Sequence, residues 1–256
     1  MEKLTIIKVG GKIVEEEQSL KQLLADFSKI EGYKILVHGG GRSATRLADR
    51  LGIENRMVNG RRITDRDTLE VVTMVYGGLV NKNIVAGLQA LGVNALGLTG
   101  ADLNLIRSEK RPVKDIDYGY VGDVKEVNVG AVSMLVSQGI VPILAPLTHD
   151  KEGNILNTNA DTIAGETAKG LAEVFDVSLV YCFEKKGVLM DENNDDSVIP
   201  EINKSDFVRL TEEKIVQGGM IPKLENAFAC IENGVKEVII TSAAEIGSSG
   251  GTRIIE

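Results

Sequence analysis

Short apolar runs alternate along this chain with longer segments in which apolar residues recur at the spacing of a helix. The first run, Leu4–Val9, is typical of a buried strand and ends at the glycine pair Gly10-Gly11. From about Glu15 to Ile30 the apolar positions fall on one helical stripe. A second short strand, Lys34–His38, precedes Gly39-Gly40-Gly41 and another predicted helix. Strand, glycine turn and helix thus follow one another twice near the N-terminus.

The same alternation continues to the end of the chain. Further apolar runs predict strands at Val93–Leu98, Ile140–Ala145, Val177–Cys182, Val235–Thr241 and Thr252–Ile255, the last as an edge strand. Helices are predicted from an N-cap at Thr64, from Asn159 to about Glu173, and over Glu225–Asn233. Residues 105–128 favour β-hairpins. The expected fold is an α/β fold, a three-layer αβα sandwich around an open, mainly parallel central sheet.

Composition narrows the classes of function. The chain has 256 residues and a net charge of −8, which disfavours nucleic acid as a partner. Neither the uninterrupted apolar run of a membrane span nor a signal-peptide profile is recognisable in the sequence, so no membrane partner is expected. Cys182 and Cys230 are too few for a disulfide framework or a zinc site, which favours a cytoplasmic location. Glycine is enriched, with 28 residues, so its clusters are informative.

Three glycine clusters lie at a strand end or a helix start, each near a cation. They are Gly10-Gly11 between Lys8 and Lys12, Gly39-Gly40-Gly41 before Arg42, and Gly218-Gly219 before Lys223. Glycine lets backbone N–H groups approach a phosphate or carboxylate closely, although tight-turn formation also explains any one cluster. The P-loop pattern is missing from the sequence. The segment from Gly39 to Ala44 fits the loose dinucleotide pattern only weakly, because no strand ending in an acid follows it.

Six segments carry motifs in a defined order. They are Ile6-Ile7-Lys8-Val9-Gly10-Gly11, Val37-His38-Gly39-Gly40-Gly41, Asn59-Gly60-Arg61-Arg62-Ile63-Thr64, Asn157-Thr158-Asn159-Ala160-Asp161, Gly218-Gly219-Met220-Ile221-Pro222-Lys223 and Gly251-Thr252-Arg253-Ile254. In combination the chain resembles the N-acetylglutamate kinase branch of the amino acid kinase family, from Leu4 to the C-terminus. His-Gly-Gly-Gly together with Asn-Gly-x-Arg-x-Thr is the more specific part of the resemblance.

The resemblance implies an enzyme that uses ATP to phosphorylate the side-chain carboxylate of N-acetyl-L-glutamate in arginine biosynthesis. Residues 1–176 would form a lobe that binds the acyl amino acid and dimerises, and residues 177–256 a lobe that binds ATP, within one continuous fold. Mg²⁺ would enter bound to the nucleotide, with no metal site on the protein itself. Relatives inhibited by arginine carry an extra N-terminal helix, whereas this first strand starts by Leu4. A homodimer insensitive to arginine is therefore expected.

Three residues are expected to carry the catalysis. By resemblance, Lys8 would stabilise the transferring phosphoryl group, Lys223 would neutralise charge on the ATP side, and Asp161 would organise both lysines. A lysine inside an apolar strand is costly unless it is paired, which favours a function for Lys8. The acceptor carboxylate is already ionised at neutral pH, so the reaction needs cations and backbone donors rather than a general base. His38 is accordingly expected to be structural.

Further residues are expected to bind the two substrates. Backbone N–H groups of Gly10, Gly11 and Gly40 would surround the phosphoryl group and the attacked carboxylate, and Gly41 would also bind the acyl amino acid. Arg62 would clamp the α-carboxylate and Asn157 would bind the amino-acid portion; Arg61 is expected to be solvated. The nucleotide would contact Glu184, Gly187, Val188, Leu189 and Val216.

Two features leave the exact substrate and its contacts open. The family pattern Thr-Asp-Val-x-Gly is replaced here by Phe183-Glu184-Lys185-Lys186-Gly187, so nucleotide contacts in this stretch are less defined. The segment Ala145–Thr148 beside the acyl pocket leaves the acyl group open, and succinyl is an alternative to acetyl. A relative acting on glutamate, carbamate or a nucleotide also stays possible on the sequence, as does a catalytically silent ligand-binding regulator.

Overall fold

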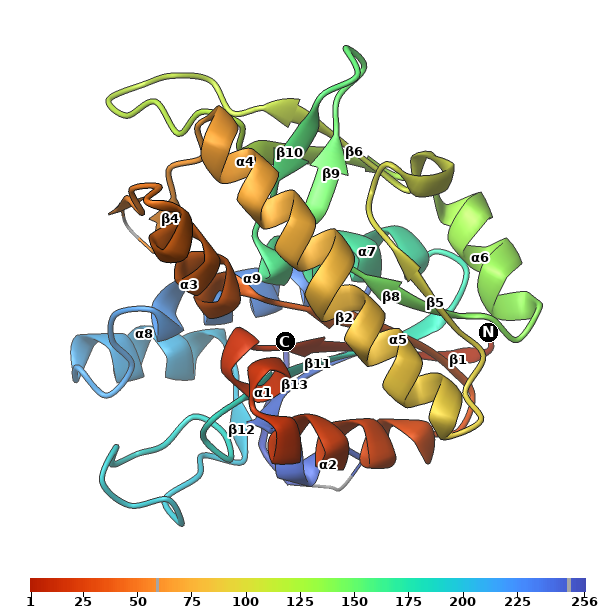
Figure 1. Cartoon of the computed structure of the whole chain (residues 1–256). Helices are drawn as coiled ribbons and strands as arrows, with labels where there is room; N and C mark the ends of the chain where they lie inside the picture. Colours follow the sequence, from red (N-terminus) through yellow and green to blue (C-terminus); the bar gives the residue numbers. More distant parts are fainter. Residues whose placement is uncertain (59, 248–249) are drawn as a thin grey trace.

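The computed structural model describes residues 1–58, 60–247 and 250–256 (Figure 1). Its central sheet has the strand order β12-β14-β13-β11-β1-β2-β8-β5. The bounds are β1 Lys3–Val9, β2 Tyr33–His38, β5 Ala95–Leu98, β8 Val141–Leu144, β11 Asp176–Phe183, β12 Glu201–Ile202, β13 Glu237–Ser242 and β14 Thr252–Ile254. Strand β1 pairs in parallel with both β11 and β2, while β14 runs antiparallel to β13. The mainly parallel sheet confirms the predicted fold class.

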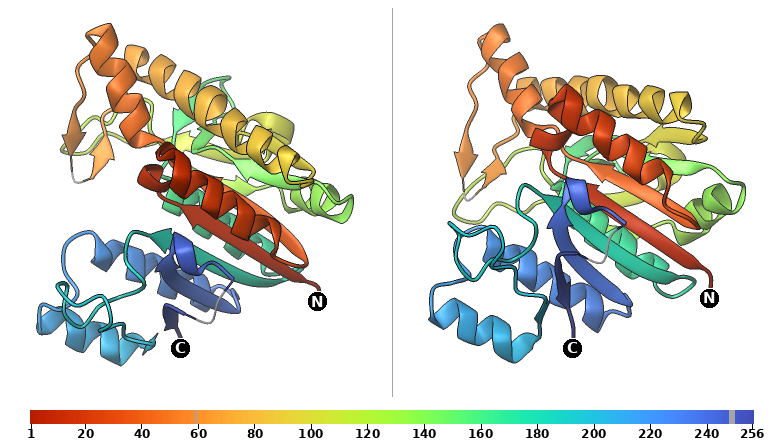
Figure 2. Two further views of the ribbon diagram at one scale, coloured as in Figure 1. Left: turned by 60° about the horizontal axis from the view of Figure 1, so that its bottom comes forward. Right: turned by 90° about the horizontal axis from the view of Figure 1, so that it is seen from below.

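Helices cover both faces of this sheet. They are α1 Gly11–Glu15, α2 Glu17–Ser28, α3 Gly41–Leu51, α4 Arg66–Val72, the π-helical segment η1 Thr73–Val80, α5 Asn81–Ala90, α6 Val129–Ser137, α7 Ala160–Leu171, α8 Lys204–Glu212 and α9 Met220–Glu232, with short 3-10 turns η2 Asp102–Asn104 and η3 Ala243–Glu245. In Figure 1, α2 and the α4–α5 rod lie in front of the sheet and α7 and α9 lie behind it. Figure 2 shows the N-terminal elements, red to green, on one side of β1 and the blue C-terminal elements on the other.

The alternation of side chains along β1 decides which layer each residue meets. Leu4 and Ile6 belong to the apolar cluster shared with α6, α7 and α9, whereas Ile7 and Val9 belong to the cluster shared with α2 and α5. Successive strand residues point to opposite faces, so Lys8 falls on the side of Leu4 and Ile6. The strand period therefore directs this lysine toward α7.

Smaller sheets lie outside the central sheet. One has the order β10-β9-β6-β7, and the other pairs β3 with β4. Their bounds are β3 Met57–Val58, β4 Arg61–Arg62, β6 Ile106–Lys110, β7 Gly122–Val127, β9 Leu147–His149 and β10 Ile155–Asn157. The antiparallel pair β6–β7 confirms the hairpin predicted within residues 105–128. Strand β10 leads directly into the loop before α7, so this small sheet places the start of that helix.

Several predicted boundaries and positions differ from the structure. The helix expected from Glu15 to Ile30 is interrupted at Glu16, whose backbone is extended, and the helical stripe therefore resumes as α2. Helix α4 is capped by Asp65, whose carboxylate accepts a hydrogen bond from the Thr68 N–H, and not by Thr64. Thr64 is instead buried in a bridge to Gly119. Strand β14 is not at the sheet edge, because β12 pairs with its outer side.

The stretch Arg66–Ala90, formed by α4, η1 and α5, is long and apolar enough by length and composition to cross a membrane. In the fold, one face of this stretch packs toward the central sheet, and its residues Val72, Ile84 and Leu88 are fully buried. The side chains of Met74 and Leu79, in contrast, are 53% and 58% exposed. This helix therefore has one face in the core and an apolar strip at the surface.

The motif residue Asn59 lies outside the described residues.

Candidate active site

The carboxyl ends of β1, β2 and β11 meet at one edge of the sheet. Val9 pairs with both His38 and Cys182, so the residues that follow in each strand, Gly10, Gly39 and Phe183, lie at the same level. Ligands of open α/β sheets bind at such an edge, because the loops there surround a common crevice. The strand register thus brings together segments that are far apart in the sequence.

Lys8 forms an ion pair with Asp161 at this edge. The distance from Lys8 Nζ to Asp161 Oδ1 is 2.7 Å, and the two side chains are 9% and 17% exposed. Asp161 lies in the first turn of α7, which Asn159 caps by accepting hydrogen bonds from the N–H groups of Asp161 and Thr162. The cap fixes where α7 begins, and this in turn fixes the position of the Asp161 carboxylate. The pairing predicted for Lys8 and Asp161 is present.

Lys223, the third residue predicted to act in catalysis, lies in the first turn of α9. This helix begins at Met220, earlier than the sequence pattern predicts. Burial lowers the pKa of its ammonium group, Asp161 opposes that effect, and Lys8 adds to it. Two lysines and one carboxylate are therefore close enough to influence one another, and the cluster carries a positive charge in excess. Such an arrangement is suited to a negatively charged ligand.

The two N-terminal glycine turns pack backbone against backbone. A Cβ atom on Gly39 would lie 3.0 Å from the Gly11 nitrogen, and one on Gly11 would lie 3.3 Å from the Gly40 nitrogen. Side chains at these positions would push the turns apart. Glycine is needed here because only its small size lets both turns present backbone N–H groups to the same crevice.

A pocket of about 190 Å³ lies on the side of α3 and β4. All four residues predicted to bind the acyl amino acid line it, namely Gly40, Gly41, Arg62 and Asn157. Asn157 is itself held by a 2.9 Å hydrogen bond from its side-chain amide to Thr64 Oγ1. We call this cavity the acceptor pocket. Arg61, expected to be solvated, is only partly exposed and also lines the pocket, because β4 lies against the cavity.

The guanidinium of Arg62 is held by several protein acceptors. It donates to the Gly41 carbonyl and to Thr45 Oγ1, each at 2.9 Å, and also to Asn55 Oδ1. Tyr76, from the π-helical segment, lies close enough to be influenced by the same guanidinium: burial raises the pKa of its phenol, and Arg62 opposes that rise. Arg62 is therefore fixed in place before any substrate arrives, with part of its five-donor fork already used.

A larger cavity of about 460 Å³ lies on the other side of Gly41, toward α9. The residues Gly10, Gly11, Glu184, Gly187 and Lys223, all predicted to contact phosphate or nucleotide, line this nucleotide-side pocket. Three others predicted to contact nucleotide do not line it, since their side chains pack in the core: Val188, Leu189 and Val216. Their role stays a prediction.

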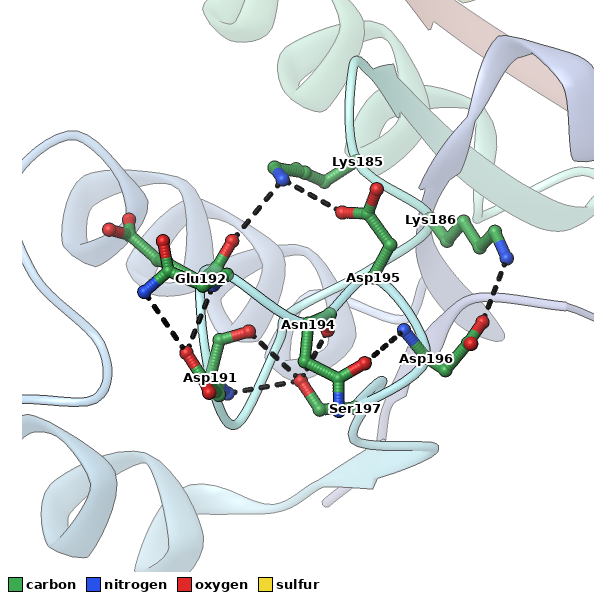
Figure 3. Close-up of polar contacts among 9 residues, drawn as sticks. Lys185, Lys186, Asp191, Glu192, Asn194, Asp195, Asp196 and Ser197 are labelled. Carbon is green, nitrogen blue, oxygen red and sulfur yellow. Dashed lines mark hydrogen bonds and ion pairs between the residues drawn. The ribbon is translucent and has the colours of Figure 1, made fainter.

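Two lysines that depart from the family pattern are engaged by a neighbouring acidic loop (Figure 3). Lys185 Nζ lies 2.8 Å from Asp195 Oδ1, and it donates to the Glu192 carbonyl at 3.3 Å. Lys186 Nζ lies 3.2 Å from Asp196 Oδ1. The hydrogen bond to Asp195 raises the pKa of Lys185. Both lysines therefore anchor the loop, which accounts for their presence in this segment.

His38 belongs to a buried hydrogen-bond network behind the glycine turn. Its Nδ1 lies 2.8 Å from the Gly39 carbonyl oxygen, and its Nε2 lies 3.1 Å from the Asn81 side-chain nitrogen, which also donates to the Ile143 carbonyl. Burial lowers the pKa of His38 to about 4, so the ring is neutral at physiological pH. The geometry agrees with the expected structural role.

Sequence reasoning missed Tyr76 and the contacts of Phe183. Tyr76 lies within an apolar helical stretch and has no motif of its own; only the π-helical turn brings its ring against Gly40. Phe183 was visible as a departure from the family pattern, but its neighbours were not. Within residues 1–58, 60–247 and 250–256, no group of three or more His, Cys, Asp or Glu side chains could hold a metal ion.

Similarity to known proteins agrees with this geometry. Residues 3–242 match the amino acid kinase family, and the chain belongs to that family. It is 72% identical over 99% of its length to all of a Parabacteroides distasonis protein named acetylglutamate kinase, and 73% identical to 98% of one of that name from Phocaeicola vulgatus. A crystal structure of smu.665 from Streptococcus mutans, 28% identical, covers 98% of both chains with a TM-score of 0.81.

Proposed function

We propose that this chain uses ATP to phosphorylate the side-chain carboxylate of N-acetyl-L-glutamate, giving the acyl phosphate and ADP, as a step of arginine biosynthesis. Full-length identity above 70% to proteins named acetylglutamate kinase supports the reaction. The observation that carries it to these residues is the buried Lys8–Asp161 pair, with Lys223, which lines the nucleotide-side pocket, close enough to interact with both.

The division of the substrates follows from the pockets. The acyl amino acid would occupy the acceptor pocket, with its α-carboxylate on Arg62 and its amino-acid portion on Asn157. ATP would occupy the nucleotide-side pocket, with its phosphates on the N–H groups of Gly10 and Gly11. Residues 1–176 would hold the acceptor, and residues 177–256 would bind the nucleotide together with the glycine turns of the N-terminal part. Mg²⁺ would arrive bound to the ATP phosphates, where it offsets their negative charge.

The chemistry required of the protein is electrostatic. A carboxylate oxygen of the acceptor forms a bond to the γ-phosphorus while the bond from that phosphorus to the β–γ bridging oxygen breaks and leaves ADP. The nucleophile is ionised at neutral pH, so no side chain has to remove a proton. Lys8 and Lys223 would stabilise the charge on the phosphoryl group in transfer, and Asp161 would keep Lys8 at the required position.

A coupled assay of ADP release tests this function directly. With Mg-ATP present, N-acetyl-L-glutamate is expected to support turnover and free L-glutamate to support little, because the free amino acid leaves the acyl part of the acceptor pocket empty. Absence of turnover with every N-acylglutamate tried would reject the proposed function.

A second acceptor, N-succinyl-L-glutamate, is favoured by the surroundings of Arg61. This side chain lines the acceptor pocket, and burial and the nearby Arg111 lower the pKa of its guanidinium. The charge of Asp123 opposes this lowering of the Arg61 pKa, but Asp123 forms its ion pair with Arg111. Among the described residues, Arg61 has no carboxylate within ion-pair distance, so it is available to a second carboxylate on the acyl chain. In the same assay, Arg61→Leu should lower kcat/KM for the succinyl compound more than for the acetyl compound.

We further propose that the chain is a cytoplasmic homodimer, with the helix face around Met74 and Leu79 as the interface. Both side chains are more than half exposed on a long helix whose other face is in the core. A second copy of the same helix would cover this apolar strip by two-fold symmetry. Light scattering is expected to give twice the chain mass for the wild type and a lower mass for Leu79→Lys. Both cysteines are buried and unpaired, in keeping with a reducing compartment.

A further inference from the structure

The ring of Phe183 lies close to both lysines of the site. The Lys223 Nζ atom is 3.8 Å from the ring centroid, and the Lys8 Nζ atom is 5.3 Å from it. Distances within about 6 Å place a cation in the attractive field of an aromatic face. Phe183 is the last residue of β11 and stands on the same face of that strand as Tyr181, whose ring is stacked with it at 6.2 Å. Both ammonium groups therefore share a ring that the sheet holds in place.

Lys223 has particular need of such a contact. Lys8 has Asp161 as its partner at 2.7 Å, whereas Lys223 forms no ion pair with any residue of the described ranges. Burial and the charge of Lys8 both lower the pKa of Lys223, and only Asp161 acts in the opposite direction. A partly buried ammonium beside another cation would move toward water unless something attractive holds it. The aromatic face 3.8 Å away is the contact that does so.

We propose that Phe183 is a positioning residue for the phosphoryl transfer, whose ring face keeps the Lys223 ammonium directed at the nucleotide-side pocket before ATP binds. This inference rests on the proposed function only for its kinetic consequences. The ring does not touch the acceptor pocket, whose lining residues do not include it, so its effect is confined to the cations of the transfer step.

The charged groups around this ring come from several elements. They are Lys8 on β1, Lys12 on α1, Arg42 on α3, Asp161 on α7, Glu184 and Lys185 after β11, and Lys223 on α9. Lys12 and Glu184 pair with each other at 2.6 Å, and Asp161 pairs with Lys8. Their charges remain in place in any variant of Phe183. A change in the behaviour of Lys223 on substitution can therefore be assigned to the ring.

The test compares Phe183→Leu, which keeps apolar bulk, with Phe183→Tyr, which keeps the aromatic face. Loss of the face is expected to lower kcat about tenfold in the leucine variant, with little change in KM for the acceptor, while the tyrosine variant stays within about twofold of wild type. The alkaline limb of the kcat profile should move to lower pH in Phe183→Leu, because the ring stabilises the charged form of Lys223. Equal activity and an unmoved pH profile in the leucine variant would overturn the proposal.

Phe207→Leu serves as the matched control. Phe207 is also partly exposed and also packs on another ring, that of Phe228 at 5.6 Å, but it lies on α8 with none of the site cations against its face. It should lose a comparable amount of thermal stability without loss of kcat. If Phe207→Leu and Phe183→Leu reduce kcat equally, the role of Phe183 is one of packing.

A spectroscopic measurement separates this proposal from the proposed function. In protein labelled with ¹³C at the lysine ε-carbons, the Lys223 ε-protons should be shifted upfield by the ring current, and the shift should vanish in Phe183→Leu and persist in Phe183→Tyr. This NMR measurement requires no turnover, so it tests the contact even if no acceptor is phosphorylated. A Lys223 resonance at the position of an ordinary lysine in wild-type protein would overturn the contact itself.

Discussion

The acceptor pocket and the nucleotide-side pocket share Gly41 but hold their charged groups in opposite ways. In the acceptor pocket, Arg62 is buried and donates to three protein acceptors. In the nucleotide-side pocket, Lys12 pairs with Glu184 at 2.6 Å while both side chains remain about half exposed. Arg42 lies 3.8 Å from the same carboxylate and is more exposed still. The acceptor pocket is therefore held by buried hydrogen bonds, and the nucleotide-side pocket is bordered by solvent-exposed ion pairs.

This difference indicates how each pocket recognises its ligand. A buried arginine that protein acceptors already hold in place loses little further entropy on binding, so the acceptor pocket is organised in advance for one shape of substrate. Exposed ion pairs contribute little to stability and exchange easily, so the nucleotide side can adapt its cations to phosphate groups.

The largest effect is expected for Lys8→Ala. Removing the cation that we propose faces the transferring phosphoryl group should lower kcat by about 10²- to 10³-fold, the range typical for loss of one preorganised charge donor. KM for ATP should change far less, because the phosphates keep their other contacts. Lys21→Ala, at an exposed lysine on α2, is the control and should behave as wild type. A loss of less than tenfold would contradict the proposed role of Lys8.

A smaller effect is expected for Arg62→Lys, in the acceptor pocket. A lysine keeps the charge but cannot reproduce the planar fork that donates to Gly41 and Thr45 and that we propose clamps the substrate. KM for the acceptor should rise about ten- to a hundredfold, with a smaller change in kcat, because binding loses charge-assisted hydrogen bonds. Arg50→Lys, at an exposed arginine in the last turn of α3, should leave KM unchanged. Equal KM values for the two variants would argue against Arg62 as the carboxylate clamp.

Behind the acceptor pocket, His38 makes stability depend on pH. Its pKa is lowered to about 4 in the folded protein from an ordinary value near 6.5. Below pH 6.5 the unfolded chain therefore binds a proton that the folded chain does not, and stability is lost as the pH falls from 6.5 toward 4. The loss attributable to His38 is about 2 to 3 kcal/mol between pH 7.5 and 4.5.

Urea unfolding of wild type and His38→Gln at both pH values checks this, since the carboxylates of both proteins titrate alike and their contribution cancels. The chain has two histidines, so their NMR titration gives a direct second reading. A pKa near 6.5 for His38 would contradict the prediction.

The smallest effect is expected for Glu184→Gln at the nucleotide-side pocket. Loss of the exposed pairs to Lys12 and Arg42 should raise KM for ATP by at most about fivefold and lower the free energy of unfolding by less than about 1 kcal/mol. The hydrogen bond from Lys12 lowers the pKa of Glu184, so the pair persists above the ordinary glutamate value and is lost only as the pH falls through the lowered one. The KM ratio should therefore be constant from pH 6 to 8 and should shrink in high salt.

Glu17→Gln removes a similarly exposed pair, that with Lys21, at a distance from the pocket and should leave KM unchanged. A large rise in KM for Glu184→Gln, of about a hundredfold, would show that the nucleotide side is as fixed as the acceptor side, and the contrast between the pockets would not hold.

The sequence by itself determined the layers of this protein and much of its candidate site. Apolar runs that end in glycine turns predict the strands from Leu4 and Lys34, because a buried parallel strand needs continuous apolar residues and its turn needs small ones. Lys8 stands out within such a buried apolar strand, because a charged side chain there requires a partner. Motifs then indicated Asp161 and Lys223 at positions distant in the chain.

Only the tertiary structure decided which groups touch. The register of β1 with β2 and β11 sets Gly10, Gly39 and Phe183 at one level, and register depends on packing across the whole sheet. The π-helical turn that brings Tyr76 to Arg62, and the ring of Phe183 against two lysines, have no local signature in the sequence. Such contacts form between residues far apart in the chain, and their energies depend on burial and distance, which a single sequence does not contain.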